Sequence, residues 1–134
     1  MSSCEMVAAP EEVMDDQTEI VNLGRDAILD CHDVYAEPVY VPEWGGQVYV
    51  RVITGHERDR FELSVNDGQR KNMVDIRARF VALVLSNESG ERLFADSDIP
   101  KLTLKSASAL DRVFGAGQIL NGMTEEAVEG LAKN

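Results

Sequence analysis

Apolar and polar residues alternate along residues 39–41 and 47–53, as they do in β-strands that cover a core. Two glycines between these stretches favour a tight turn, so we predict a β-hairpin at about residues 38–53. A two-residue Gly-Gly turn would place Pro42 at a hydrogen-bonded site opposite Tyr49, where proline has no N–H to donate. We therefore expect a three-residue loop, with Glu43 opposite Gln47 and Gly46 in the left-handed conformation.

This register sorts the hairpin side chains into two faces. The core face is expected to contain Pro38, Tyr40, Pro42, Val48, Val50 and Val52. The other face is expected to contain Val39, Val41, Tyr49 and Arg51, with Trp44 at the tip. Large aromatic and aliphatic side chains provide most of the energy of protein interfaces, so this second face is the predicted partner-binding surface unless a helix of the chain covers it.

Helical patterns occupy most of the remaining chain. A short helix is expected at about 24–31, and a capping box formed by Thr54 and Glu57 predicts a helix that continues to about Val65. Longer helices are expected at about 73–86 and 106–120, and Thr124 is placed to cap a last one. The predicted fold is α+β: one hairpin packed with four or five α-helices in a single small domain.

The helix expected at 73–86 is apolar around most of its circumference, which predicts burial on more than one side. Arg77 projects from the middle of its apolar side. Two explanations remain: its side chain extends along the helix to reach water, or it pairs with an acid of this chain or of a partner. Arg77 is therefore included among the candidate partner-binding residues.

Acidic residues are concentrated at the N-terminus. Residues 1–37 contain ten acids and one base, whereas the chain as a whole has a formal net charge of −11. Residues 1–23 are predicted to be an acidic, disordered arm, and residues 24–134 the folded domain. A net-negative chain is poorly suited to bind phosphate backbones, so no nucleic-acid partner is expected. The absence of a secretory signal or membrane span predicts a cytoplasmic protein with no membrane partner.

No motif predicts catalysis, a cofactor or a metal site. Asp30-Cys31-His32-Asp33 has metal-binding side chains, but adjacent residues point in different directions and no second ligand pair has zinc-like spacing. Gly115 and Gly117 interrupt a helical pattern without the rest of a phosphate-binding fingerprint, and close helix packing is the expected reason for them.

Several short motifs follow one another in a characteristic order. They are Val41-Pro42-Glu43-Trp44-Gly45-Gly46, Val48-Tyr49-Val50-Arg51, Thr54-Gly55, Glu57-Arg58-Asp59, Phe61-Glu62, Arg92-Leu93-Phe94, Lys105-Ser106-Ala107, Ala109-Leu110 and Leu120-Asn121-Gly122-Met123-Thr124-Glu125-Glu126. In this combination the chain, from about residue 27 to 134, resembles the tail assembly chaperones of siphophages and related prophages. The acidic arm is not part of the resemblance.

The resemblance implies a non-catalytic protein that binds the tape measure protein, keeps it soluble and helps recruit tail tube protein. It also implies a second, extended product made by a backward ribosomal frameshift; codons for Ala132-Lys133-Asn134 are able to form the slippery sequence A AAA AAY. Such an extended form and further copies of this chain are additional partners to consider. The alternatives are a structural tail or head–tail connector protein and a bacterial adaptor unrelated to phages.

Overall fold

The computed structural model describes residues 19–68 and 70–123. The chain divides into two units, Met1–Tyr35 and Ala36–Asn134. In the first unit, Arg25–Leu29 form the short helix α1, as predicted, but none of its residues is buried. Ile28 and Leu29 are 56% and 64% exposed, so the large apolar side chains of α1 bury little of their surface.

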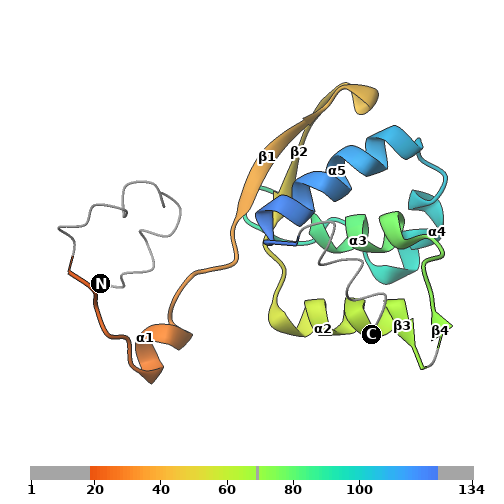
Figure 1. Cartoon of the computed structure of the whole chain (residues 1–134). Coiled ribbons are helices and arrows are strands. Elements are labelled where there is room, and N and C mark those ends of the chain that lie inside the picture. The colour runs from red at the N-terminus through yellow and green to blue at the C-terminus, as the bar shows by residue number, and fades with distance from the viewer. Residues whose placement is uncertain (1–18, 69, 124–134) are drawn as a thin grey trace. The chain divides into compact units, whose positions relative to one another are not determined.

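The second unit is an α+β domain, which confirms the predicted fold class (Figure 1). Its elements are β1 (Ala36–Val41), the 3-10 turn η3 (Pro42–Trp44), β2 (Gly46–Arg51), α2 (Gly55–Val65), β3 (Asn66–Asp67), β4 (Arg70–Lys71), α3 (Ile76–Val84), β5 (Leu85–Ser86), the 3-10 turn η4 (Asp96–Asp98), α4 (Ile99–Leu102) and α5 (Ala107–Leu120). Strands β1, β2 and β5 form an antiparallel sheet in that order, and β3 pairs with β4. The helix predicted to begin at Thr124 lies outside the described residues.

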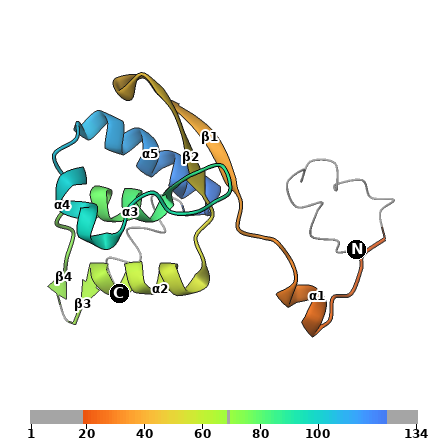
Figure 2. The same ribbon diagram turned by 180° about the vertical axis from the view of Figure 1, so that it is seen from behind.

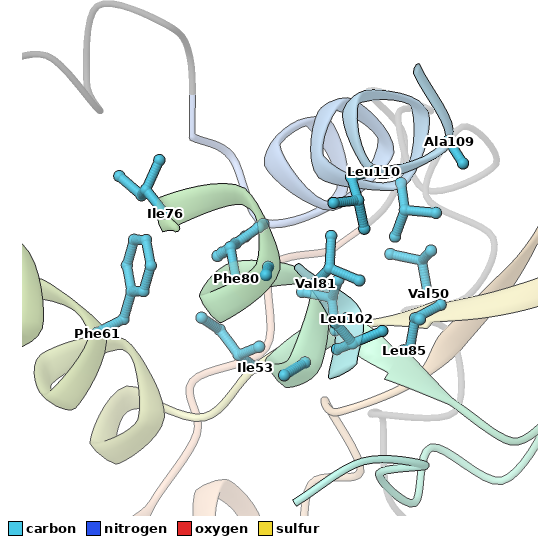
Figure 3. Packing of buried hydrophobic residues seen from close by; sticks show 14 of the residues in the cluster. Val50, Ile53, Phe61, Ile76, Phe80, Val81, Leu85, Leu102, Ala109 and Leu110 are labelled. Atoms are coloured by element: carbon cyan, nitrogen blue, oxygen red, sulfur yellow. The ribbon is translucent and has the colours of Figure 1, made fainter. Parts of the chain in front are cut away.

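Helix α3 is the centre of the core. It contacts α2, α4, α5 and β2, and the hairpin lies across α5 (Figures 1 and 2). Six of its nine residues are buried, which agrees with the prediction that this helix is covered on several sides. Figure 3 shows Phe80 of α3 between Phe61 of α2 and Leu110 of α5. The Phe80 ring centroid is 5.2 Å from those of both Phe61 and Phe114.

The hairpin exists as predicted, but its predicted register is wrong. Val41 pairs with Gly46 and Val39 with Val48, so four residues rather than three form the turn. Pro42 begins a 3-10 turn because its ring fixes φ near the helical value. Gly45, not Gly46, takes the left-handed conformation with φ of 70°, and its N–H donates to the Pro42 carbonyl.

The faces of the first strand are consequently reversed. The register differs from the predicted one by three residues, and an odd shift moves a whole strand's side chains to the other face of its partner. Val41 is fully buried, whereas Tyr40 is 63% exposed. Val48 and Val50 face the core as predicted. The predicted outer face of Val39, Val41, Tyr49 and Arg51 therefore does not exist.

Helix α3 is shorter at both ends than the predicted helix at 73–86. Asp75 has φ of 56°, a left-handed conformation that prevents the helix from beginning before Ile76. Leu85 has extended backbone angles and pairs with Val50. No sign in the sequence indicates that the helix ends at Val84, because the residues of a buried strand are as apolar as those of a buried helix.

The two glycines of α5 have different surroundings. A Cβ on Gly117 would lie 2.8 Å from Phe80 Cε2 and 3.3 Å from both methyl groups of Val84. Close packing against α3 therefore requires glycine at 117. A Cβ on Gly115 would meet nothing within 4 Å, so the packing explanation is wrong for that position.

These surroundings predict opposite effects of two alanine substitutions. Gly115→Ala should raise the free energy of unfolding by about 0.5–1 kcal/mol, because alanine has the better helix propensity. Gly117→Ala gains the same propensity but overpacks the buried Phe80 ring, which costs about 1–3 kcal/mol, so its net effect should be destabilising. Urea unfolding of both variants measures this. Equal stabilisation by both would contradict the packing at Gly117.

The end of α5 is joined to the strand–helix connection by Asn121. Its side-chain oxygen accepts from the Ile53 N–H at 2.9 Å, and its amide nitrogen donates to the carbonyls of Arg51 and Gly117. Gly122 has φ of 67°, and the N–H groups of Gly122 and Met123 return to the carbonyls of Ile119 and Gln118. This is a Schellman ending, whose apolar contact is the buried Met123.

Replacing Asn121 with alanine should lower the free energy of unfolding by about 1–3 kcal/mol, because the Ile53 N–H is left without its acceptor. Gln118→Ala is the control in the same helix and should change stability by less than about 0.5 kcal/mol. Chemical denaturation followed by circular dichroism compares the two. Equal stability of the variants would show that the Asn121 bonds contribute nothing.

Candidate functional site

An apolar groove of about 240 Å³ opens beside the hairpin turn. It is lined by Trp44, Val48, Leu85, Leu93, Phe94, Leu102 and Lys105. The hairpin supplies one wall, and the segments from β5 to the start of α5 supply the rest. Apolar side chains with a few polar groups at the rim form a typical binding surface for another polypeptide.

The turn η3 positions Trp44 in the groove wall. The two carboxylate oxygens of Glu43 accept hydrogen bonds of 3.0 Å from Nε and Nη2 of Arg112 on α5. This two-bond pairing fixes the turn relative to α5. The hydrogen bond from Arg112 lowers the pKa of the Glu43 carboxyl to about 2. Trp44 is partly buried and packs against the core.

A compact turn brings Leu93 and Phe94 to the opposite wall. The side-chain oxygen of Asn87 accepts from the N–H groups of Ser89 and Glu91. The chain then returns along β5, where the Leu93 N–H donates to the Leu85 carbonyl. Leu93 is nevertheless 52% exposed, so the fold places a large apolar side chain at the mouth of the groove without covering it.

Helix α4 and the following turn form the floor of the groove, and Lys105 places one positive charge in its lining. Pro100 lies in the first turn of α4, and Leu102 is buried beneath the groove. Lys101 and Lys105 are exposed, and neither forms an ion pair within the described part of the chain. Lys105 also lines a second groove of about 210 Å³ that begins at Met73 and Ile76.

A larger cleft of about 370 Å³, the polar cleft, lies beside α2 and is lined mainly by polar and charged residues. Two arginines that line this cleft, Arg79 and Arg92, form hydrogen bonds that connect segments of the backbone. Arg79 donates to the carbonyls of Ser64 and Asn72, and Arg92 donates to the carbonyl of Ala82 and to Asp96. Burial lowers the pKa of Arg79, and the nearby Asp75 carboxylate opposes this. These contacts give both guanidinium groups a structural role.

The six predicted site residues do not form one surface. Val41 lies in the core, Val39 packs partly against it, and Tyr49 lies on the opposite face of the sheet. Only Trp44 lines the apolar groove. Arg77 is exposed and pairs with Asp111 of α5, the intrachain form of the predicted ion pair. No observation tests a partner-binding role for these residues, and that role stays a prediction.

Arg51 is buried and connects three elements. Its guanidinium donates to the Leu83 carbonyl at 2.8 Å and to Glu57 at 2.7 Å. Glu57 also completes the predicted capping box with Thr54. Partial burial raises the pKa of the Glu57 carboxyl, but the hydrogen bonds from Arg51 and Thr54 outweigh it, so the pKa lies below its ordinary value. Arg51 thus stabilises the fold where the sequence suggested an exposed contact.

Sequence reasoning predicted Trp44 but missed the other six residues that line the groove: Val48, Leu85, Leu93, Phe94, Leu102 and Lys105. Leu93 and Phe94 are two large apolar residues in a segment that otherwise contains polar and small residues, which was the available signal. These two residues line the same groove as Trp44 because of the path that the chain takes after β5, and no local sequence pattern predicts that path.

Two further features are absent from the described residues: a membrane-spanning helix and a cluster of metal-binding side chains. Within residues 19–68 and 70–123, no helix is long and apolar enough to cross a bilayer. In the same residues, no cluster of three or more His, Cys, Asp and Glu side chains is placed to hold a metal ion.

The architecture is that of a small α+β domain whose hairpin and helices enclose one core and leave an apolar groove beside the hairpin turn. No protein-family model matches the chain, and no curated protein matches its sequence. Among solved structures, the fold is similar to that of the bacteriophage HK97 tail assembly chaperone. The TM-score is 0.50 at 18% sequence identity, over 66% of this chain and 87% of the HK97 chain. The resemblance inferred from the sequence motifs is therefore matched by a shared fold.

The Glu43–Arg112 pair predicts an acid-sensitive groove wall. A carboxyl with a folded-state pKa of about 2 stabilises the fold above its ordinary pKa of 4.5, and this contribution disappears as the pH falls toward 2. Between about pH 5 and pH 2, the wild type should therefore lose more stability than Glu43→Gln. Urea unfolding across this pH range provides the comparison. Identical pH dependence of the two proteins would contradict the contribution of this pair.

Proposed function

We propose that this chain is a non-catalytic tail assembly chaperone that acts in the cytoplasm of a bacterial host. It binds the tape measure protein, keeps that long polypeptide soluble and helps recruit tail tube protein around it. The shared fold with the HK97 tail assembly chaperone carries this proposal. The apolar groove beside Trp44 provides a surface on which a client side chain can be buried.

The energetics support a surface of this kind. Fully burying a Leu or Met side chain that was exposed contributes about 1.5–3 kcal/mol. Leu93 and Leu104, 52% and 85% exposed, lie within and next to the segment that lines the groove. A partner that covers them and Trp44 gains this energy without a chemical step. The charge of −11 keeps the chain itself soluble while these side chains remain exposed.

The proposal includes two further features from the sequence resemblance. One is an extended form of this chain made by frameshifting at Ala132-Lys133-Asn134, and the other is assembly with further copies of itself. The acidic arm of residues 1–23 is proposed to be dispensable for folding.

Co-expression with the tape measure protein encoded in the same genome tests the function. The tape measure protein should move from the insoluble to the soluble fraction and should elute together with this chain. An unrelated acidic protein of similar size serves as the control for a general effect of charge. An insoluble tape measure protein, with no co-elution, would contradict the proposed function.

Purified particles separate this function from that of a structural connector. A chaperone leaves before assembly is complete, so mass spectrometry of the mature tails should detect tube and tape measure proteins but not this chain. Stoichiometric amounts of this chain in the particles would instead favour the structural alternative.

A further inference from the structure

We infer that the groove binds an amphipathic helix of the client through one large apolar side chain, and that Lys101 and Lys105 select a client segment with an acidic residue about one helical turn away. The inference rests on the proposed chaperone function and assigns the chemistry of the segment that is recognised. It follows from the unpaired cations, the exposed apolar side chains and the blocked sheet edges.

The cations are the first observation. The chain is strongly acidic, yet Lys105 lines its apolar groove, and Lys101 is exposed on the adjoining helix α4. Neither lysine forms an ion pair in the described ranges. Lys105 lines the apolar groove and also the second, more polar groove, whose lining includes the acid Asp75. The neighbouring Arg77 is already paired with Asp111. An incoming carboxylate therefore meets the available ammonium group of Lys105 here, and that of Lys101 lies one helical turn earlier in the chain.

The exposed apolar side chains are the second observation. Leu93 lies at the mouth of the first groove, and Met73, which lines the second, is 44% exposed. Leu104 immediately precedes Lys105 and is 85% exposed. Apolar side chains thus flank the cationic position on both sides. A helix that places apolar and acidic residues three or four positions apart matches this order, since such residues share one face.

The sheet edges disfavour the other common way of binding a peptide. A peptide that adds a strand needs an open edge with free N–H and C=O groups. At one edge, β1 contains Pro38, which has no N–H to donate. At the other edge, Ser86 of β5 already forms a bridge with Arg92. The client is therefore expected to bind through side chains in the groove.

Trp44 makes occupation of the groove measurable, because it is the chain's one tryptophan and lines the groove. The probes are overlapping synthetic peptides of the tape measure protein, with any tryptophan replaced by phenylalanine. Peptides that bind should shift Trp44 emission to shorter wavelengths. Each peptide that binds should contain a large apolar residue and an Asp or Glu three or four positions away from it.

Charge reversal tests the role of the lysines. The double variant Lys101→Glu/Lys105→Glu should bind these peptides at least about tenfold more weakly. Replacing the peptide's acidic residue with lysine should restore binding to the double variant. Arg60→Glu, a charge reversal at the polar cleft, is the matched control and should bind as the wild type does.

Loss of apolar contact is tested with two leucines. Leu93→Ser should weaken binding, whereas Leu63→Ser should not, because Leu63 is 70% exposed on α2 and lines none of the three cavities. Circular dichroism of each variant checks that it is folded.

The outcomes separate this inference from the proposed function. If peptides or the full tape measure protein bind without a change in Trp44 emission, or bind the double lysine variant normally, the inference is overturned and the chaperone function stands. If the wild type binds neither the peptides nor the full tape measure protein, both are overturned. A loss of self-association in Leu93→Ser without any peptide, measured by light scattering, would assign the groove to a second copy of this chain and also overturn the inference.

Discussion

The close approach of α5 to α3 is the contact on which the rest of the domain depends. Phe80 of α3 is fully buried, and only a residue without a Cβ at 117 leaves space for its ring. Because α3 is surrounded by α2, α4, α5 and β2, its position fixes theirs. Leu85 continues directly from α3 into the sheet, so helix and sheet cannot move independently. A small domain gains much of its stability from such shared burial.

The groove results from this arrangement. The hairpin covers α5 with Val41 and Val50, while its turn extends beyond the core and carries Trp44 to the groove. The ion pair between Glu43 and Arg112 fixes the turn to α5, and among the described residues no strand pairs with the outer edge of β1. The wall of the groove is thus held by the Glu43–Arg112 pair and by the packing of Trp44 and Val48 against the core, and its floor belongs to the core. A surface built this way can adjust to a partner without disturbing α3.

Local patterns predicted the elements well where a local cause determines them. The capping box at Thr54 began α2 as expected, and the apolar face of α5 faced the core. The predicted register of the hairpin was wrong because the turn that begins at Pro42 contains four residues instead of three. The resulting shift of three residues reversed the faces of β1. Arg51 was misplaced for a different reason: Leu83 of α3 and Glu57 of α2 bind its guanidinium and bury it, and these contacts depend on the tertiary fold. The groove joins residues from four segments, which only the tertiary fold brings together.

Hydrogen exchange of this chain, free and bound to the tape measure protein, tests the central claim that the groove beside Trp44 is the working surface. The account predicts new protection of the backbone amides in residues 44–48, 93–94 and 101–105 on binding, with little change in α2. Protection concentrated on α2 and the polar cleft, with the groove segments unchanged, would contradict it.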